Sequence, residues 1–420
     1  MGRLIAGVNH TTYSHGLQEN RPSNGLLASP KQKTLAKKIW QRHRGCSDAL
    51  IGVKRGLHFT GRRDRAFLRA MQEAFAYHYL RCPEFQKLCA DQQFYPWDLR
   101  RSEQLPNIPY FFVTCLKYHK VRSVPKNRIV LTLRSSGTGG QTSAIYLDRT
   151  SLRRIKDIVR HIYMDLDMVN DVRTNYLCFT YDPEVAKDVG TAFSDKLLTG
   201  LTRVNHVCYA IIWDEEKKDW HLDIPRVQKA LERFEASGRP FRLLGFPAHT
   251  WSVLQQIIED RGGRPFRFGP KSYVITGGGW KNFDDRQIDP VVFREQVGRW
   301  LGIPTGHVRD LYGMVEHGVP YCECEKHRMH VPIYSRIYVR DPATLELLPP
   351  ESEGLLQFVT PYHNSFPAIS LLTTDRGLIQ EKQCRCGRES PVLKLLGRAG
   401  VSKHKGCAIA ALKVGAGKST

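Results

Sequence analysis

Glycines and hydroxyl side chains form a dense run between two apolar segments, 128–133 and 144–147. Glycine lets the backbone take a positive φ and approach a ligand closely. Consecutive free N–H groups in such a loop favour an anion, and Ser and Thr hydroxyls can donate to phosphate oxygens. No lysine follows the last glycine, so the loop differs from the G-x-x-x-x-G-K-[ST] loop of common NTPases, and a plain turn is the alternative. We interpret the run as a phosphate-binding loop formed by Ser135, Ser136, Gly137, Thr138, Gly139 and Gly140.

A second glycine run, Gly277, Gly278 and Gly279, directly follows a strand-like segment and precedes Trp280 and Lys281. In open α/β sheets ligands lie beyond the carboxyl ends of the strands, and glycine there lets a flat base lie against the backbone. The run therefore predicts a base-binding turn, with a simple turn as the alternative.

An aromatic residue, a glycine and a carboxylate follow one another within five residues, as Tyr312, Gly313 and Glu316. The ring could stack on a base, and the carboxylate suits Mg²⁺, which prefers one or two carboxylates together with substrate phosphates. Asp375 follows another strand-like segment and could accept hydrogen bonds from two ribose hydroxyls, although an isolated Asp is commonly a turn residue.

Two short segments are rich in cysteine and histidine. The first contains Cys322, Cys324, His327 and His330, and the second contains Cys384 and Cys386. Thiolates and imidazoles are the ligands that Zn²⁺ prefers, four of them in a tetrahedral structural site. The two segments predict a zinc site, with inert free thiols as the alternative, and the residues alone leave open which four bind.

Cys407 lies near the C-terminus, close to Lys403 and Lys405. Nearby cations lower the pKa of a thiol and so favour the thiolate, which is the nucleophilic form. We interpret Cys407 as a candidate nucleophile on a segment that could swing between sites; a lone cysteine in a basic tail is the alternative.

The charge of the chain is strongly unbalanced. Its 420 residues include 63 Lys or Arg and 41 Asp or Glu, a formal net charge of +22, which indicates an anionic partner or substrate without naming its class. No apolar run approaches the roughly 20 residues that cross a bilayer, and no secretory signal begins the chain. Eleven cysteines in so long a chain favour reduced thiols or a metal site over a disulfide scaffold, so we expect a cytoplasmic protein.

The segments that must position these residues alternate between helical and strand-like spacing, which predicts an α/β domain with a largely parallel sheet. Expected helices are 64–80, a segment capped by Thr150 or Ser151, 225–236, 249–260 and 290–301; expected strands are 176–181, 206–213, 241–245 and 272–276. Beyond residue 330, strands at 333–339, 354–360 and 368–373 predict a mixed or antiparallel β subdomain. We therefore expect a loose N-terminal segment (1–45), an α/β domain (46–396) whose β subdomain holds the zinc site at about 321–390, and a short mobile C-terminal segment (397–420).

The order of these motifs resembles the adenylate-forming superfamily, which includes acyl-CoA synthetases and phenylacetate-CoA-ligase-like members, over residues 125–410. The resemblance implies an adenylating α/β domain that uses ATP and Mg²⁺ to convert a carboxylate to an acyl-adenylate. It implies that the 135–140 loop holds the triphosphate, that 277–279 and Tyr312 hold the adenine, and that Glu316 binds Mg²⁺. It also implies that Asp375 and Arg398 contact the ribose, with Arg398 at a hinge.

The cysteine and histidine segments look like the zinc site of phenylacetate-CoA-ligase-like members. That resemblance favours Cys324, His330, Cys384 and Cys386 as ligands, with Cys322 as an alternative. A zinc ion bound by these residues would hold the Glu316 loop against the β subdomain.

The chain is most similar to the acyl-protein synthetases, the long-chain-fatty-acid–protein ligases of the bacterial fatty-acid reductase complex. The runs 278–281 and 312–321 and the place of Cys407 carry this resemblance. It implies transfer of a fatty acyl group from acyl-AMP to Cys407 as a thioester, and delivery to a reductase or carrier protein. Most superfamily members end in a domain with a catalytic lysine, whereas only a short segment follows Arg398 here. Lys281 or Mg²⁺ would then supply the positive charge at the phosphate.

Two other functions stay open at this point. One is a phenylacetate-type acyl- or aryl-CoA ligase in which Cys407 is idle, and the other is a non-catalytic nucleotide-sensing or nucleic-acid-binding protein. The basic charge is spread along the chain without an aromatic-rich stacking motif, so we expect no nucleic-acid partner.

Overall fold

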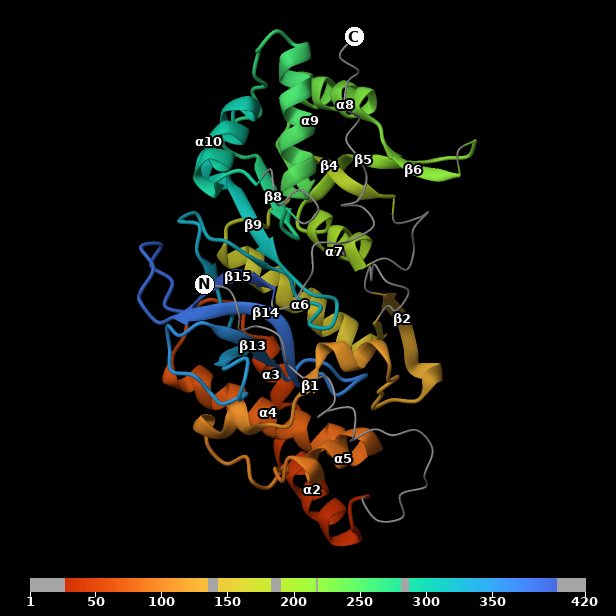
Figure 1. Ribbon diagram of the computed structural model, residues 1–420, viewed down its shortest axis with the longest axis vertical. Coiled ribbons are helices and arrows are strands. Elements are labelled where there is room, and N and C mark those ends of the chain that lie inside the picture. Colours follow the sequence, from red (N-terminus) through yellow and green to blue (C-terminus); the bar gives the residue numbers. More distant parts are fainter. Residues whose placement is uncertain (1–26, 135–142, 183–189, 217, 281–286, 399–420) are drawn as a thin grey trace, which may run out of the picture.

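The computed structural model describes residues 27–134, 143–182, 190–216, 218–280 and 287–398, and they form the α/β architecture with two main sheets shown in Figure 1. The larger sheet has seven strands, and its five inner strands run parallel. Its strands, in spatial order, are β10 (Tyr321–Cys322), β9 (Val308–Tyr312), β8 (Tyr273–Gly277), β7 (Phe241–Gly245), β4 (Arg173–Tyr181), β5 (Arg203–Asp214) and β6 (Asp219–Leu222). The two edge strands, β10 and β6, pair antiparallel with their neighbours.

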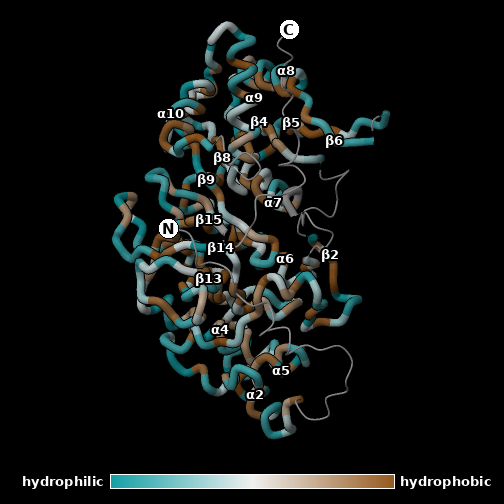
Figure 2. Tube along the Cα trace, in the orientation of Figure 1, coloured by the Kyte–Doolittle hydropathy of each residue, from teal (hydrophilic) through white to brown (hydrophobic). Residues whose placement is uncertain are grey.

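Helices cover both faces of this sheet, as parallel strands require. Alternate residues of β4 point to opposite faces: Leu177 and Phe179 pack in one core cluster, and Tyr176 and Cys178 pack in the other. The first face carries α8 (Ile224–Ala236), α9 (Pro247–Asp260) and α10 (Pro290–Leu301), and the second carries α6 (Arg149–Asp165) and α7 (Gly190–Thr199). Apolar and polar residues alternate along these helices in Figure 2, as amphipathic helices require.

The second sheet has six strands and forms the β subdomain. In order these are β11 (Met329–His330), β15 (Val392–Arg398), β14 (Ser370–Gln380), β13 (Gly354–Val359) and β12 (Arg336–Arg340), with β1 (Phe111–Phe112) beside β14. All pairings are antiparallel except that of β1 with β14. A separate hairpin of β2 (Ile129–Arg134) and β3 (Ala144–Asp148) flanks the predicted phosphate loop.

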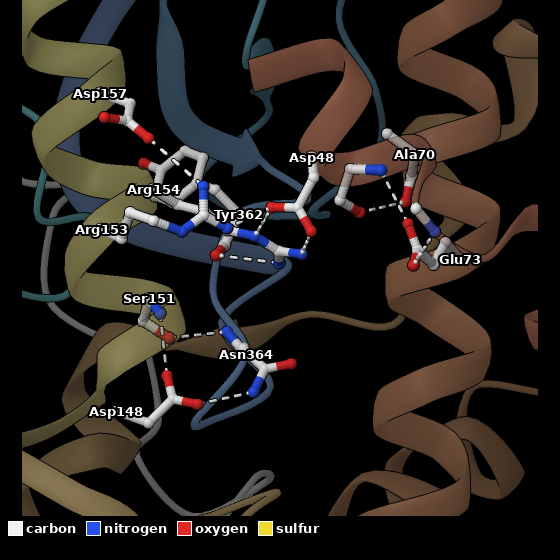
Figure 3. Close-up of polar contacts among 12 residues, drawn as sticks. Asp48, Ala70, Glu73, Asp148, Ser151, Arg153, Arg154, Asp157, Tyr362 and Asn364 are labelled. Atoms are coloured by element: carbon white, nitrogen blue, oxygen red, sulfur yellow. Dashed lines mark hydrogen bonds and ion pairs between the residues drawn. The ribbon is translucent and has the colours of Figure 1, made fainter. Parts of the chain in front are cut away.

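Four helices near the N-terminus, α2 (Pro30–His43), α3 (Cys46–Ile51), α4 (Gly61–Arg81) and α5 (Pro83–Asp91), lie beneath the β subdomain in Figure 1. Figure 3 shows how they attach to α6: Arg154 donates to both carboxylate oxygens of Asp48 on α3, at 2.9 and 3.1 Å. This hydrogen bonding lowers the pKa of Asp48 to about 2. At the start of α6, Asp148 accepts a hydrogen bond from Asn364 at 2.7 Å, so the loop after β13 is fixed to the same corner.

Two local predictions are wrong. The segment expected to be loose, 1–45, contains helix α2, because Ser29 forms a capping box with Gln32, Pro30 occupies the first turn, and Ala36 is buried. Helix α6 is capped by Asp148, whose carboxylate accepts from the Ser151 backbone, and not by Thr150 or Ser151. Residues 1–26 of the predicted N-terminal segment lie outside the described residues.

The boundary predicted at residue 397 also shifts. Strand β15 runs through Gly397 to Arg398, which pair with Arg376 and Asp375 of β14. The remainder of the predicted C-terminal segment, 399–420, lies outside the described residues. None of the helices in the described ranges is long and apolar enough to span a membrane.

Candidate functional site

The second glycine run lies where strands β8 and β9 end side by side. Gly277 is the last residue of β8 and pairs with Leu311 of β9, and a Cβ added to it would lie 2.7 Å from the Leu311 carbonyl oxygen. Gly278 and Gly279 have φ values of 80° and 70°, in the region that glycine adopts without strain. The chain therefore turns sharply at the carboxyl end of the sheet, which is the edge where ligands bind in α/β folds.

Tyr312 and Asp375 are brought together from different sheets. Tyr312 ends β9 of the large sheet, and its hydroxyl donates to the Asp375 carboxylate of β14 at 2.7 Å. The Tyr312 ring also stacks on Phe358 of β13, with centroids 5.9 Å apart. Asp375 is buried within a strand, beside a register shift at Arg376, so it is not a turn residue. The two predicted nucleotide-binding side chains are thus in direct contact.

Glu316 lies in the turn between β9 and β10 and is largely buried. Its Oε1 accepts a hydrogen bond of 2.6 Å from the Ser143 hydroxyl, and Ser143 is fully buried. Ser143 follows the predicted phosphate loop and precedes β3. The carboxylate predicted to bind Mg²⁺ and the described end of the phosphate-loop segment therefore meet, although they are far apart in the sequence.

The turn that carries Glu316 is fixed through its neighbour His317. Tyr362 donates from its hydroxyl to the His317 carbonyl at 2.8 Å, and the His363 ring lies 3.1 Å from the same oxygen. The His317 ring contacts the hydroxyls of Tyr321 and Tyr362, both at 2.9 Å. Burial holds the pKa of His317 well below its usual value, so the ring is neutral. The backbone next to Glu316 is held in place by groups of both sheets.

Several predicted residues fall outside the described ranges: Ser135, Ser136, Gly137, Thr138, Gly139, Gly140, Lys281 and Cys407. Arg398 is the last described residue, and its backbone position in β15 pairs with Asp375. The predicted ribose-binding pair thus lies on adjacent strands.

Four side chains that could hold a metal ion converge near the junction of the two sheets. The ligand atoms of Cys324, His330, Cys384 and Cys386 all lie within 4.8 Å of one another. Cys386 Sγ lies 3.2 Å from His330 Nε2, and Cys324 Sγ lies 3.9 Å from Cys384 Sγ. Three thiols and one imidazole form a donor set that suits a structural zinc ion.

Neighbouring groups orient these ligands. Ser390 contacts His330 Nδ1 with its hydroxyl at 3.0 Å, which leaves Nε2 directed at the thiols. Burial lowers the pKa of His330 to about 4, so the imidazole is neutral and able to bind a metal. Cys322, the alternative ligand, lies in β10 and is not part of the cluster.

The cluster links elements of both sheets. Cys324 lies on the segment from β10 of the large sheet to β11 of the small one, and Cys384 and Cys386 lie between β14 and β15. A metal bound here would fasten the strand after the Glu316 turn to the β subdomain.

Two residues of the site escape prediction from the sequence. Ser143 closes the glycine-rich run but has the same residue type as several neighbours, and no local signal connects it to Glu316. His317 directly follows a predicted ligand, yet a buried histidine is also an ordinary core residue. Their roles depend on contacts with distant segments.

Comparisons with known proteins show the family of the chain. The family model described as "Acyl-protein synthetase, LuxE" matches residues 48–413. The long-chain-fatty-acid–luciferin-component ligase of Aliivibrio fischeri is 25% identical over 352 residues, which cover 82% of this chain and 88% of that protein. The protein of the same name from Vibrio harveyi is 23% identical over 81% of this chain and 86% of its own length.

A more distant relative and the solved structures indicate the fold. The phenylacetate-coenzyme A ligase of Thermus thermophilus is 23% identical over 77% of this chain and 68% of its own. A crystal structure of 2-hydroxyisobutyryl-CoA ligase with 2-HIB-AMP and CoA superposes with a TM-score of 0.66 at 17% identity, over 82% of this chain and 70% of that one. The chain therefore belongs to the LuxE family of acyl-protein synthetases and is an acyl-adenylate-forming ligase.

Proposed function

We propose that this ligase activates a long-chain fatty acid with MgATP and transfers the acyl group to its own Cys407. The fatty acid carboxylate attacks the α-phosphorus of ATP, and pyrophosphate leaves, which gives acyl-AMP. The Cys407 thiolate then attacks the acyl carbonyl, AMP leaves with the electron pair of the broken C–O bond, and a thioester forms. The enzyme delivers this acyl group to a reductase or carrier protein.

The hydrogen bond between Ser143 and Glu316 is the observation that carries this proposal. Ser143 ends the glycine-rich segment that we assign to the triphosphate, and Glu316 is the carboxylate that we assign to Mg²⁺. Mg²⁺ in nucleotide sites takes few protein carboxylates and several phosphate oxygens, so these two segments must lie together. When bound, the ion would offset charge on the phosphates.

The remaining residues would position the nucleotide. Gly277, Gly278, Gly279 and Tyr312 would form the adenine site at the ends of β8 and β9, while Asp375 and Arg398 would face the ribose. The Tyr312 hydrogen bond fixes one oxygen of Asp375, so the carboxylate is oriented before ATP arrives. Lys281 would supply positive charge at the reacting phosphate.

The relatives support the fatty-acid substrate and the protein acceptor. Both Aliivibrio fischeri and Vibrio harveyi proteins are named long-chain-fatty-acid–luciferin-component ligases, and they cover more than four-fifths of this chain. The Thermus thermophilus relative, a phenylacetate-coenzyme A ligase, favours the second candidate function, acyl- or aryl-CoA formation. Acyl transfer that requires free coenzyme A would support that second candidate.

Labelling with ATP and radioactive tetradecanoate tests the acceptor. We expect label on the wild-type protein and none on Cys407→Ser, while both proteins exchange pyrophosphate into ATP. Cys115→Ser, which changes a half-buried thiol, is the matched control and should label normally. Equal labelling of Cys407→Ser would contradict the acceptor role.

A further inference from the structure

A surface pocket of about 570 Å³ lies next to the metal cluster and plays no part in the proposed reaction. Two segments form most of its wall: residues 325–328 after Cys324, and Gln380 at the end of β14 together with residues 382–385. Val392 of β15 completes it. Its volume is within the range of small-molecule sites. Tyr312, Glu316 and Asp375 are not among its lining residues, so it is separate from the candidate nucleotide site.

The wall of the pocket is strongly basic. Four exposed cationic residues line it: Lys326, Arg328, Lys382 and Arg385. None of the four forms an ion pair with another residue in the described ranges, and Arg328 only donates to the neutral Gln380 amide at 3.2 Å. Their charges are therefore available to an external anion.

The one carboxylate in the wall is already neutralised. Glu325 accepts a hydrogen bond of 2.8 Å from Arg388, whose side chain is largely buried. The Arg388 guanidinium offsets the charge of this carboxylate within the wall. The pocket thus presents four free cations and no free anion of its own.

The exposure of these cations indicates the size of the partner. Small-molecule sites hold their ligands with a few buried polar groups, whereas exposed cations on long side chains are typical of the polar rim of protein interfaces. Here all four cations lie at the surface, and the buried residues of the wall are Cys384 and Val392. This arrangement fits an extended acidic segment better than a small anion.

The pocket is also held in shape. The Cys324 and His330 ligands bracket the first loop, and Cys384 and Cys386 lie at the end of the second. Two loops fixed at the same point keep the four charges close together, and a preorganised site loses less entropy on binding.

We propose that this basic pocket docks an acidic segment of the protein that receives the acyl group. The identity of the docked protein as the acyl acceptor rests on the proposed function, whereas the binding of an acidic segment does not. Complementary charge would speed the encounter of the two proteins and orient the acceptor.

Fluorescence anisotropy of a labelled hexaglutamate peptide tests the pocket directly, without ATP or fatty acid. The pocket variant is Lys382→Glu/Arg385→Glu, and the control is Lys37→Glu/Lys38→Glu on α2, which makes the same change in net charge at two other exposed cations. A hexaglutamine peptide controls for binding that does not depend on charge. Circular dichroism confirms that both variants fold.

We expect the pocket variant to bind hexaglutamate about tenfold or more weakly, and the control to stay within about twofold of wild type. Equal weakening in both variants would mean that net charge alone attracts the peptide, and would overturn the proposal. Binding of hexaglutamine as tight as that of hexaglutamate would overturn it as well. Because the assay needs no catalysis, its failure leaves the adenylation proposal standing, and the reverse also holds.

Discussion

The cysteine–histidine cluster and the candidate nucleotide site both join the two sheets, but they do so differently. The cluster gathers four side chains whose ligand atoms lie within 4.8 Å of one another; His330 belongs to strand β11, and the three cysteines lie on the segments between β10 and β11 and between β14 and β15. The nucleotide site is spread over both sheets, which meet there through contacts such as the hydrogen bond from Tyr312 to Asp375. The cluster is therefore suited to hold the two sheets together. The nucleotide site depends on the relative position of the sheets that the cluster maintains. Loss of a cluster residue should mainly affect stability, and loss of a nucleotide-site residue should mainly affect activity.

The largest expected effect is the loss of a metal ligand. Cys324→Ser should lose bound zinc and several kcal/mol of stability, since zinc-finger peptides bind zinc with roughly 10–16 kcal/mol. Cys322→Ser is the matched control, because it changes a buried thiol of the same segment outside the cluster. Measurements of zinc content and thermal unfolding would check this. A Cys324→Ser protein that keeps its zinc would contradict the assignment of Cys324 as a ligand.

Acid should weaken the packing between α4 and the loop after β13, where His78 and His363 are buried. Burial lowers the pKa of His78 to about 3 and that of His363 to about 4, both below the unfolded value of about 6.5. Between pH 6.5 and 4 these two histidines bind more protons in the unfolded chain than in the native one, so the stability that they contribute is full above pH 6.5 and is lost as the pH falls. Each histidine contributes about 1.4 kcal/mol per pH unit in that window.

Urea unfolding at several pH values measures this slope. His78→Gln should reduce it, and His119→Gln, which changes an exposed histidine, should leave it unchanged. A His78→Gln protein with the same slope as wild type from pH 6.5 to 5 would contradict the assignment of a neutral buried histidine.

The smallest of these effects is expected at the Tyr312–Asp375 hydrogen bond. Tyr312→Phe should raise the KM for ATP by about threefold to tenfold, in line with about 1 kcal/mol for one hydrogen bond. Asp375→Asn should raise it further, because Asp375 would also bind the ribose. Tyr118→Phe, at an exposed tyrosine, is the control. Additive effects of Tyr312→Phe and Asp375→Asn in the double variant would show that the pair is not coupled.

Most of the large sheet could be predicted from local pattern. Strand β7 and helix α10 have the expected bounds, since their apolar spacing and the flanking Pro290 are strong signals. Helix α2 could not be predicted, because most of its residues are basic or polar and Ala36 is its one buried residue. Strand β9 also lacked a signal: it contains Arg309 and Asp310, and only pairing with β8 makes it a strand.

The metal ligands could be named because their side chains are diagnostic and closely spaced in two segments. The groups that hold the Glu316 turn could not be named, because Ser143, which donates to Glu316, and Tyr362, which donates to the His317 carbonyl, are common residue types whose contacts depend on how the hairpin and the sheets pack. The basic pocket could not be predicted either, because the two segments that line it are distant in the sequence.

Pyrophosphate exchange into ATP, with tetradecanoate as the acid, tests most directly whether the Glu316 turn and the glycine-rich loop act on one triphosphate. Glu316→Gln should lose roughly a hundredfold or more in exchange rate, because the ion loses its carboxylate, while its zinc content stays unchanged. Glu346→Gln, at an exposed site, should exchange at the wild-type rate. Wild-type exchange by Glu316→Gln would contradict the account.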